Sequence, residues 1–133
     1  MYKTILVFII WILPTLLFGQ EKKAAANKLK SVTVYEQKYE KVPGKSIIES
    51  LTRYDHSGNI TEEIEYKLGK VDKHFTYEYD AAGNKIRETE FDPAGKKIKV
   101  TEYKYSNNLR AEKTVYNGNN QILSKKTYKY EMY

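Results

Sequence analysis

Polar and apolar residues alternate in short runs along the chain from Ser31 onward. The clearest run lies between 71 and 80, where one set of alternate positions holds Val71, Lys73, Phe75, Tyr77 and Tyr79 and the other set is polar. Successive side chains of a β-strand point to opposite faces of the sheet, so this period is typical of strands. The pattern predicts strands in which one face is more apolar than the other.

Turn signals divide this region at intervals of 10 to 14 residues. They lie at Pro43-Gly44, Ser57-Gly58, Leu68-Gly69, Ala82-Gly83, Ala94-Gly95, Asn107-Asn108 and Asn117-Gly118. Short strands at this spacing are typical of an all-β meander. The sequence therefore predicts an all-β fold over residues 31–133, an antiparallel meander of about eight strands built from tandem β-hairpins.

The alternation changes phase between 96 and 105, where Ile98 and Val100 are even and Tyr103 and Tyr105 are odd. A bulge near Thr101 would explain this, and so would partial cover of both faces. Eight strands about 4.8 Å apart would span nearly 40 Å, and the aliphatic residues suffice for one buried face. We expect a curled sheet or partial barrel, with an open twisted sheet as the alternative.

A Tyr-Asp signature marks two of the turns, Tyr54 to Asn59 and Tyr79 to Asn84, and weaker copies begin at Phe91 and Tyr116. Asp or Asn at a turn start bonds the backbone two residues on, and Gly supplies the positive φ that closes the loop. This chemistry predicts structural turn positions at Asp55, Gly58, Asn59, Asp80, Gly83, Asn84, Asp92, Gly95, Asn117 and Gly118.

The register of one hairpin can be predicted from its charges. If Asp92 to Gly95 forms a four-residue loop, Glu90 faces Lys97 and Glu88 faces Lys99. Opposite charges that face each other across strands favour one register over its neighbours. We therefore expect these two cross-strand ion pairs.

The signature recurs with a period of about 25 residues, since Tyr54, Tyr79, Tyr105 and Tyr130 lie 25, 26 and 25 apart. The segment Phe75 to Ile86 resembles the YD repeat of rearrangement-hotspot (Rhs) proteins. The resemblance covers roughly residues 46–131 and implies tandem hairpins stacked into a spiralling sheet. In large members of the family such a sheet forms a shell around a toxin segment, but about three units are too few for a closed shell. The resemblance therefore implies the hairpin architecture in a short form, without the shell. Some YD repeats are associated with carbohydrate binding.

The first nineteen residues differ from the rest. Lys3 precedes an apolar run from Ile5 to Phe18, and the small residue Gly19 follows. This order is typical of a cleavable signal peptide, and the run is short for a bilayer span of about 20 residues; a buried core helix is the alternative. Residues 20–30 are polar and alanine-rich, which predicts a flexible lead-in.

The chain contains no cysteine, which excludes disulfides, thiolate metal sites and a lipoprotein anchor. With the signal peptide, this predicts a secreted or periplasmic protein that keeps no stable membrane anchor after cleavage. The formal net charge is +6 and is spread through lysine-acid alternation. Such a charge indicates anionic partners, or else a soluble surface whose lysines discourage edge-to-edge pairing.

Catalytic chemistry has little support in the sequence. His56 lies in a predicted turn and His74 on the polar face of a predicted strand. Neither has a nucleophile or metal-ligand partner that the sequence reveals. We predict no enzyme activity, no catalytic residue, no metal and no cofactor.

Tyrosine and lysine alternate in Thr101 to Tyr105 and in Thr127 to Tyr133, which makes these segments the best candidate surface. Aromatic rings stack on sugars or bases, and lysines attract carboxylates or phosphates. The candidate binding residues are Tyr77, Tyr103, Tyr105, Tyr128, Tyr130, Lys104 and Lys129. The alternative is that these tyrosines pack between strands, in which case alanine there unfolds the domain.

These observations predict an exported non-enzymatic β-repeat protein that acts as a binding or structural module at the cell envelope. For an exported protein, envelope polysaccharide is a better partner than nucleic acid. The alternative is a protein-interaction partner of a larger secreted repeat or toxin system, joined through its edge strands.

Overall fold

The computed structural model describes residues 28–39 and 44–133, and the secondary structure within them is all β. The strands are β1 (Ser31–Glu36), β2 (Ile47–Tyr54), β3 (Ile60–Lys67), β4 (Lys70–Tyr79), β5 (Lys85–Phe91), β6 (Lys97–Ser106), β7 (Leu109–Asn117) and β8 (Ile122–Thr127). The predicted all-β fold of eight strands is confirmed. The predicted signal peptide, residues 1–19, lies outside the described residues, as does most of the lead-in.

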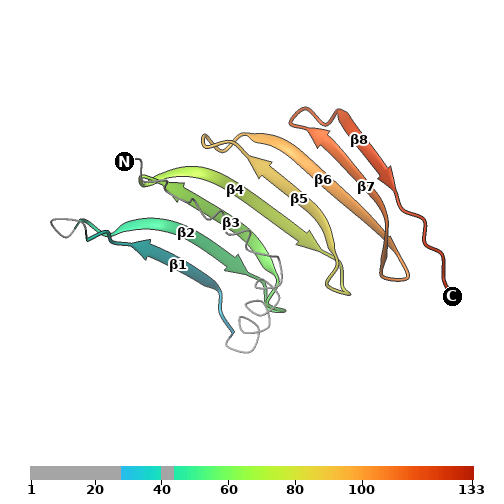
Figure 1. Ribbon diagram of the computed structural model, residues 1–133, viewed down its shortest axis with the longest axis horizontal. Helices are drawn as coiled ribbons and strands as arrows, with labels where there is room; N and C mark the ends of the chain where they lie inside the picture. Colours follow the sequence, from blue (N-terminus) through green and yellow to red (C-terminus); the bar gives the residue numbers. More distant parts are fainter. Residues whose placement is uncertain (1–27, 40–43) are drawn as a thin grey trace, which may run out of the picture.

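The eight strands form one antiparallel sheet in the order β1-β2-β3-β4-β5-β6-β7-β8. They lie side by side in a single layer, with β1 and β8 at opposite edges (Figure 1). The sheet is not closed into a barrel, because β1 and β8 do not pair with each other. None of the described residues belongs to a helix that could cross a membrane.

The turns that begin with Asp or Asn share one geometry. In the turn after β4, the Asp80 carboxylate oxygen Oδ1 accepts hydrogen bonds from the backbone N–H groups of Ala82 and Asn84, both at 2.9 Å. The N–H of Gly83 donates to the Asp80 carbonyl (3.0 Å). Gly83 has φ +82°, a conformation that other L-residues seldom adopt. The turns beginning at Asp55, Asp92 and Asn117 make the same bonds.

The last of these turns departs from the others in its glycine. Asn120, with φ 63°, stands where the other three turns have glycine. Asn is among the few residues besides glycine that tolerate this conformation. Gly118 is required for a steric reason, since a Cβ built there would collide with the carbonyl oxygen of Lys97. Glycine at 118 therefore allows close approach of two backbones.

Two further hairpins close with two-residue turns. Leu68 and Gly69 have φ 52° and 75°, and Asn107 and Asn108 have φ 51° and 61°. Positive φ at both central residues defines the type I′ turn, whose twist matches that of the flanking strands.

Each of the seven strand pairs contains one register shift, and in each case the extra residue lies on the second strand. A bulge of this kind reverses the face to which the following side chains point. The residues skipped are Glu49, Thr61, Asp72, Ile86, Ile98, Ala111 and Leu123.

These bulges correct two expectations. Because Asp72 is skipped, Val71 and Lys73 lie on opposite faces and not on one. The expected pairs Glu90–Lys97 and Glu88–Lys99 are wrong, since Glu90 lies opposite Lys99 and forms an ion pair with it. The turn after β5 has five residues, and Ile98 adds one more before Lys99, so the register moves by two.

The phase change in β6 comes from cover of both faces, with the bulge at Ile98 and not near Thr101. Pairing is continuous from Lys99 to Glu102 against β5 and from Lys99 to Lys104 against β7. Val100 and Thr101 point to opposite faces, yet each is only 4% exposed. Among the described residues, Ile60 and Val100 are the only buried apolar side chains. Because this apolar core is small, other contacts must contribute to the stability of the sheet.

The register defines the two faces of the sheet. We call one the tyrosine face; it carries Phe75, Tyr77, Glu88, Thr101, Tyr103, Lys113 and Lys126. We call the other the ion-pair face; it carries Glu62, Thr76, Arg87, Val100, Glu102, Glu112 and Lys125.

Candidate functional site

Aromatic rings and cations alternate across the tyrosine face. The Lys85 Nζ atom lies 4.8 Å from the ring centroid of Tyr77 and 5.8 Å from that of Tyr103. The Arg110 guanidinium lies 4.6 Å from the Tyr103 centroid and 5.9 Å from that of Tyr128. We call these five residues the tyrosine–cation row. It crosses from β4 to the residue after β8, about 19 Å at four strand spacings of about 4.8 Å.

The repeat produces this row. Lys85 and Arg110 are 25 residues apart, and each stands near the start of a strand that follows a turn. Pairing sets Lys85 opposite Tyr79 and Arg110 opposite Tyr105, which brings each cation to the tyrosine face. Because equivalent residues of successive units fall on the same face, one ring–cation contact becomes a row.

Two more tyrosines hold the backbone under the row. The Tyr105 hydroxyl donates to the carbonyl of Lys85 (2.9 Å), and the Tyr130 hydroxyl donates to the carbonyl of Arg110 (2.8 Å). Both bonds span 20 residues, so they are the same contact in successive units. Tyr105 and Tyr130 therefore position the cations, and their hydroxyl groups donate to the protein backbone and not to a ligand.

Two tyrosines of the row, Tyr77 and Tyr103, have a pKa raised above the ordinary value of a tyrosine. Burial, followed by a 2.7 Å hydrogen bond from the Tyr77 hydroxyl to Glu63, raises the pKa of Tyr77. Burial, followed by the charge of Glu88, raises the pKa of Tyr103. Glu88 also forms an ion pair with Lys85 at 2.7 Å. At this end of the row, charges are balanced within the protein.

The other end of the row has an excess of positive charge. Tyr103, Lys113 and Lys126 stand opposite one another on β6, β7 and β8, and the Lys113 Nζ lies 5.8 Å from the Tyr103 ring centroid. In the part of the chain that the structure describes, Arg110, Lys113 and Lys126 form no ion pair with a carboxylate. The Arg110 Nε atom is buried without a hydrogen-bond partner there.

An open hollow of about 620 Å³ lies next to Tyr77, between the turns that begin at Asp55 and Asp80. Its size falls within the range of small-molecule sites. Polar and aromatic groups line it, including Ser57, Asn59 and Tyr79. Hydrogen bonds from Asn84 hold the pKa of Asp80 below its ordinary value, so Asp80 stays charged while it serves the turn.

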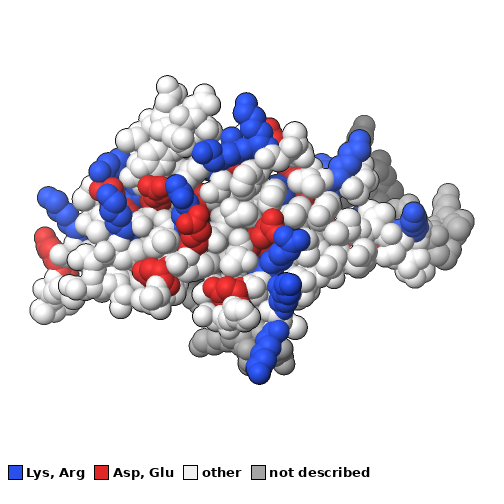
Figure 2. Space-filling model, turned by 180° about the vertical axis from the view of Figure 1, so that it is seen from behind, with Lys and Arg blue, Asp and Glu red and all other residues white. Residues whose placement is uncertain are grey.

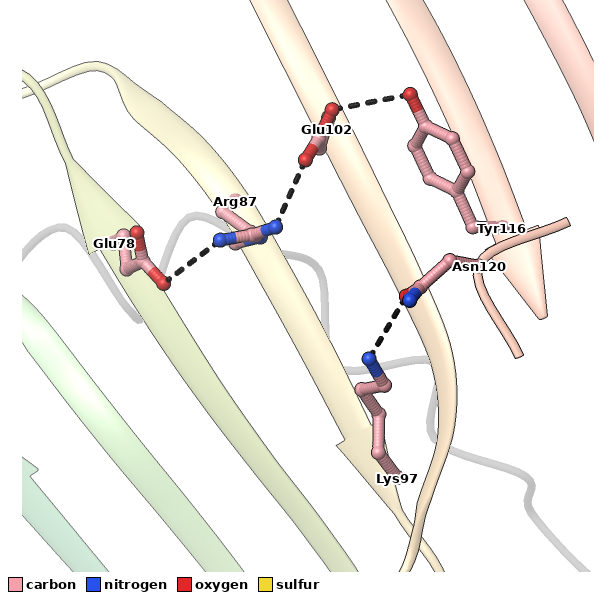
Figure 3. Close-up of polar contacts among 6 residues, drawn as sticks. All are labelled: Glu78, Arg87, Lys97, Glu102, Tyr116 and Asn120. Carbon is pink, nitrogen blue, oxygen red and sulfur yellow. Dashed lines mark hydrogen bonds and ion pairs between the residues drawn. The ribbon is translucent and has the colours of Figure 1, made fainter. Parts of the chain in front are cut away.

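The opposite face pairs its charges across strands. Arg87 lies between Glu78 (3.7 Å) and Glu102 (3.0 Å), and Glu102 accepts a 3.2 Å hydrogen bond from Tyr116 (Figure 3). Lys97 donates to Asn120 nearby (2.9 Å; Figure 3). Seen from behind, the molecule carries acidic and basic side chains interspersed, with no large block of either sign (Figure 2).

Glu112 is the second centre of charge on the ion-pair face. Its carboxylate binds Lys125 (2.8 Å) and Lys104 (3.1 Å). Hydrogen bonds from Lys125 and then Lys104 lower the pKa of Glu112 to about 2. The same contact raises the pKa of Lys104.

The structure brings together three of the candidate binding residues, Tyr77, Tyr103 and Tyr128, and sets Tyr105 and Tyr130 beside them. Lys104 lies on the ion-pair face, because adjacent strand residues point to opposite sides. Lys129 is exposed in the segment after β8.

Sequence reasoning missed Lys85, Arg110, Lys113 and Lys126. The 25-residue interval between Lys85 and Arg110, equal to that of the tyrosines, was the available signal. Lys113 and Lys126 carry no such signal, since only the register sets them opposite each other.

The two histidines take different positions. His56 is exposed in its turn. His74 lies 2.8 Å from a Glu62 oxygen and stacks on Phe91 at 4.8 Å, while Arg53 binds the same Glu62 carboxylate. The hollow beside Tyr77 does not include His74. Within the described residues, no three His, Asp or Glu side chains come together in a way that could hold a metal ion.

No protein-family model matches the chain, and no curated protein matches it. Among solved structures, the chain is similar to the crystal structure of TarM, with 10% sequence identity and a TM-score of 0.31. The match covers 82% of this chain and 23% of that one, so the chain spans less than a quarter of the length of the structure it matches. A likeness at this TM-score carries no argument about function.

Proposed function

We propose that the protein is an exported, non-enzymatic binding module that holds envelope polysaccharide along its tyrosine face. The tyrosine–cation row carries this proposal, because it repeats the same ring and cation at regular steps across the sheet. A periodic surface suits a ligand that is itself a repeating polymer. The resemblance to YD repeats and the signal-like leader support the proposal from the sequence.

The side chains of the row are also preorganised for binding. Lys85 and Arg110 each contact two rings, so the rings are held in place before a ligand arrives. Side chains that are already ordered lose less entropy on binding. Aromatic rings offer apolar contact to sugar C–H groups, while the cations donate hydrogen bonds to sugar oxygens.

The test is binding of the full chain to purified envelope polysaccharides, by cosedimentation and by calorimetry. Tyr128→Ala removes the last ring of the row, and Tyr116→Ala, on the ion-pair face, is the matched control. We expect Tyr128→Ala to weaken binding about tenfold, as loss of a stacked ring does, and Tyr116→Ala to leave it unchanged. Folding of each variant is checked by circular dichroism. Absence of binding to every envelope polysaccharide would overturn the proposal.

One observation favours a second candidate, a protein-interaction partner joined through its edge strands. All six residues of β8 are exposed, including Ile122 (63%) and Leu123 (61%). An exposed edge strand can accept a strand from another chain. Co-purification from the native secretome tests this candidate. Recovery of a strictly monomeric protein without a partner would rule it out.

A further inference from the structure

Three cations gather at one end of the tyrosine face without an acidic partner. Lys113 on β7 stands directly opposite Lys126 on β8, and Arg110 lies between the Tyr103 and Tyr128 rings on the same face. We infer that Arg110, Lys113 and Lys126 form a subsite for the carboxylate or phosphate group of an acidic polysaccharide. The inference rests on the proposed function and names the class of polymer that it requires.

The pairing of Lys113 with Lys126 places two like charges opposite each other within the sheet. Several other lysines have a carboxylate partner instead, as Lys99 has Glu90 and Lys104 has Glu112. Lys67 and Lys70 are also paired, but they flank the two-residue turn between β3 and β4. Like charges directly opposite each other destabilise a pair of strands. An anion bound between the two ammonium groups would remove this repulsion. Binding of an anion would therefore stabilise this pair of strands relative to the free protein.

Arg110 supplies a directional donor. Its guanidinium is fixed over the Tyr103 ring, and its Nε has no hydrogen-bond partner among the described residues. A guanidinium presents several N–H groups in a fixed fork that matches the oxygens of a carboxylate or phosphate. The protein leaves part of this donor capacity unused. Arg110 and Lys113 both lie near the Tyr103 ring, so a guanidinium and an ammonium group are available to one anionic group.

The position of the subsite decides between a free anion and a polymer. It lies at the β7–β8 end of the tyrosine–cation row, where Tyr103 and Tyr128 belong to both. A polysaccharide that follows the row would bring one of its acid groups to this end, while its neutral part contacts Tyr77. A neutral polymer would leave the three cations without an anionic partner.

Calorimetry of the full chain with polygalacturonate and with its methyl ester gives the first arm of the test. The two polymers share their sugar and linkage, and the ester replaces each carboxylate by a neutral methyl ester group. We expect at least about tenfold tighter binding of the acid, weakening as salt is raised. Lys113→Gln and Lys126→Gln should each weaken binding of the acid about three- to tenfold. Lys125→Gln, the same charge change on the same strand but on the ion-pair face, should leave it unchanged.

Nuclear magnetic resonance gives the second arm, with ¹⁵N-labelled wild-type chain and three small probes. Galacturonate tests the carboxylate source, inorganic phosphate tests the phosphate source, and galactose is the neutral control. We expect either anion to shift the Arg110 Nε–H resonance and the amides of Lys113 and Lys126. We expect galactose to leave these resonances unchanged.

The outcomes separate the two proposals. Equal binding of acid and ester, unaffected by Lys113→Gln, would keep the polysaccharide function and overturn the subsite. No polymer binding, with Arg110 shifted by galacturonate, would overturn the polysaccharide function and keep only an anion site. No shift by either anion would overturn the subsite outright. Tighter binding of a single-stranded oligonucleotide than of polygalacturonate would overturn the choice of polysaccharide.

Discussion

The two faces of the sheet stabilise a single layer by different means. On the ion-pair face, Arg87 joins two carboxylates and Glu112 joins two lysines, so each charge is answered within the protein. On the tyrosine face, cations pack on aromatic rings, and three cations at the β7–β8 end have no carboxylate partner in the described residues. The ion-pair face therefore neutralises these charges within the protein. The tyrosine face leaves cations available to a ligand, and for this reason we place the proposed function there.

Removal of the central ring should break the tyrosine face most severely. Tyr103 contacts Lys85, Arg110 and Lys113, so Tyr103→Ala removes the surface on which all three pack. We expect the free energy of unfolding to fall by about 2 kcal/mol, since the ring is half-buried. Urea denaturation measures the loss. Tyr103→Phe keeps the ring and should cost less than about 1 kcal/mol; equal losses for both variants would argue against ring–cation packing.

The tyrosine face should weaken in alkali. The pKa of Tyr77 in the folded protein is raised above its ordinary value of 10.0, so the folded state holds a proton that the unfolded state releases. Its contribution to stability is complete below pH 10 and is lost as the pH rises beyond that value. We expect the urea midpoint of the wild type to fall between pH 9.5 and 11 more steeply than that of Tyr77→Phe. Parallel curves would contradict the buried, hydrogen-bonded hydroxyl.

The ion-pair face should weaken at the opposite end of the pH scale. Lys125 and Lys104 lower the pKa of Glu112 from 4.5 to about 2, so the folded state favours the charged carboxylate. Its contribution is complete above about pH 5 and is lost as the pH falls toward 2. Urea midpoints measured across this range should drop less in Glu112→Gln than in the wild type. High salt should reduce the difference, because the pairs are partly exposed.

The smallest expected change reverses one charge of the proposed subsite. Lys126→Glu places a carboxylate opposite Lys113, so repulsion becomes attraction. We expect the free energy of unfolding to rise by about 0.2–1 kcal/mol, while binding of polygalacturonate is lost. Thermal denaturation and calorimetry on the same preparation measure both effects. A variant that loses stability would show that Lys126 serves the fold.

Local sequence predicted the strands and turns because local chemistry causes them. Asp80 bonds the N–H groups of Ala82 and Asn84, and Gly83 adopts the positive φ that the turn requires. Such signals act within a few residues, so they can be read without knowledge of the rest of the fold. The 25-residue period likewise indicated that Tyr105 and Tyr130 occupy equivalent positions, and both make the same hydrogen bond 20 residues back in the chain.

The candidate site could be predicted only in part. The tyrosines were identified from their alternation, but Lys104 was assigned to the same surface although it points to the opposite face. The cations of the row were missed, because the bulges at Ile86 and Ala111 decide which face Lys85 and Arg110 reach. A bulge depends on pairing with a neighbouring strand, and a single strand's alternation does not reveal it.

By itself, the sequence determined how many strands the described domain has, where the turns lie and which tyrosines repeat, since these depend on backbone preferences of nearby residues. Only the tertiary structure decided the register, the open edges and the face on which each charge lies. The physical reason is that one skipped residue reverses every side chain that follows it. The pairing of strands, and not the composition of any one of them, set Lys113 against Lys126 and left three cations beside Tyr103 and Tyr128.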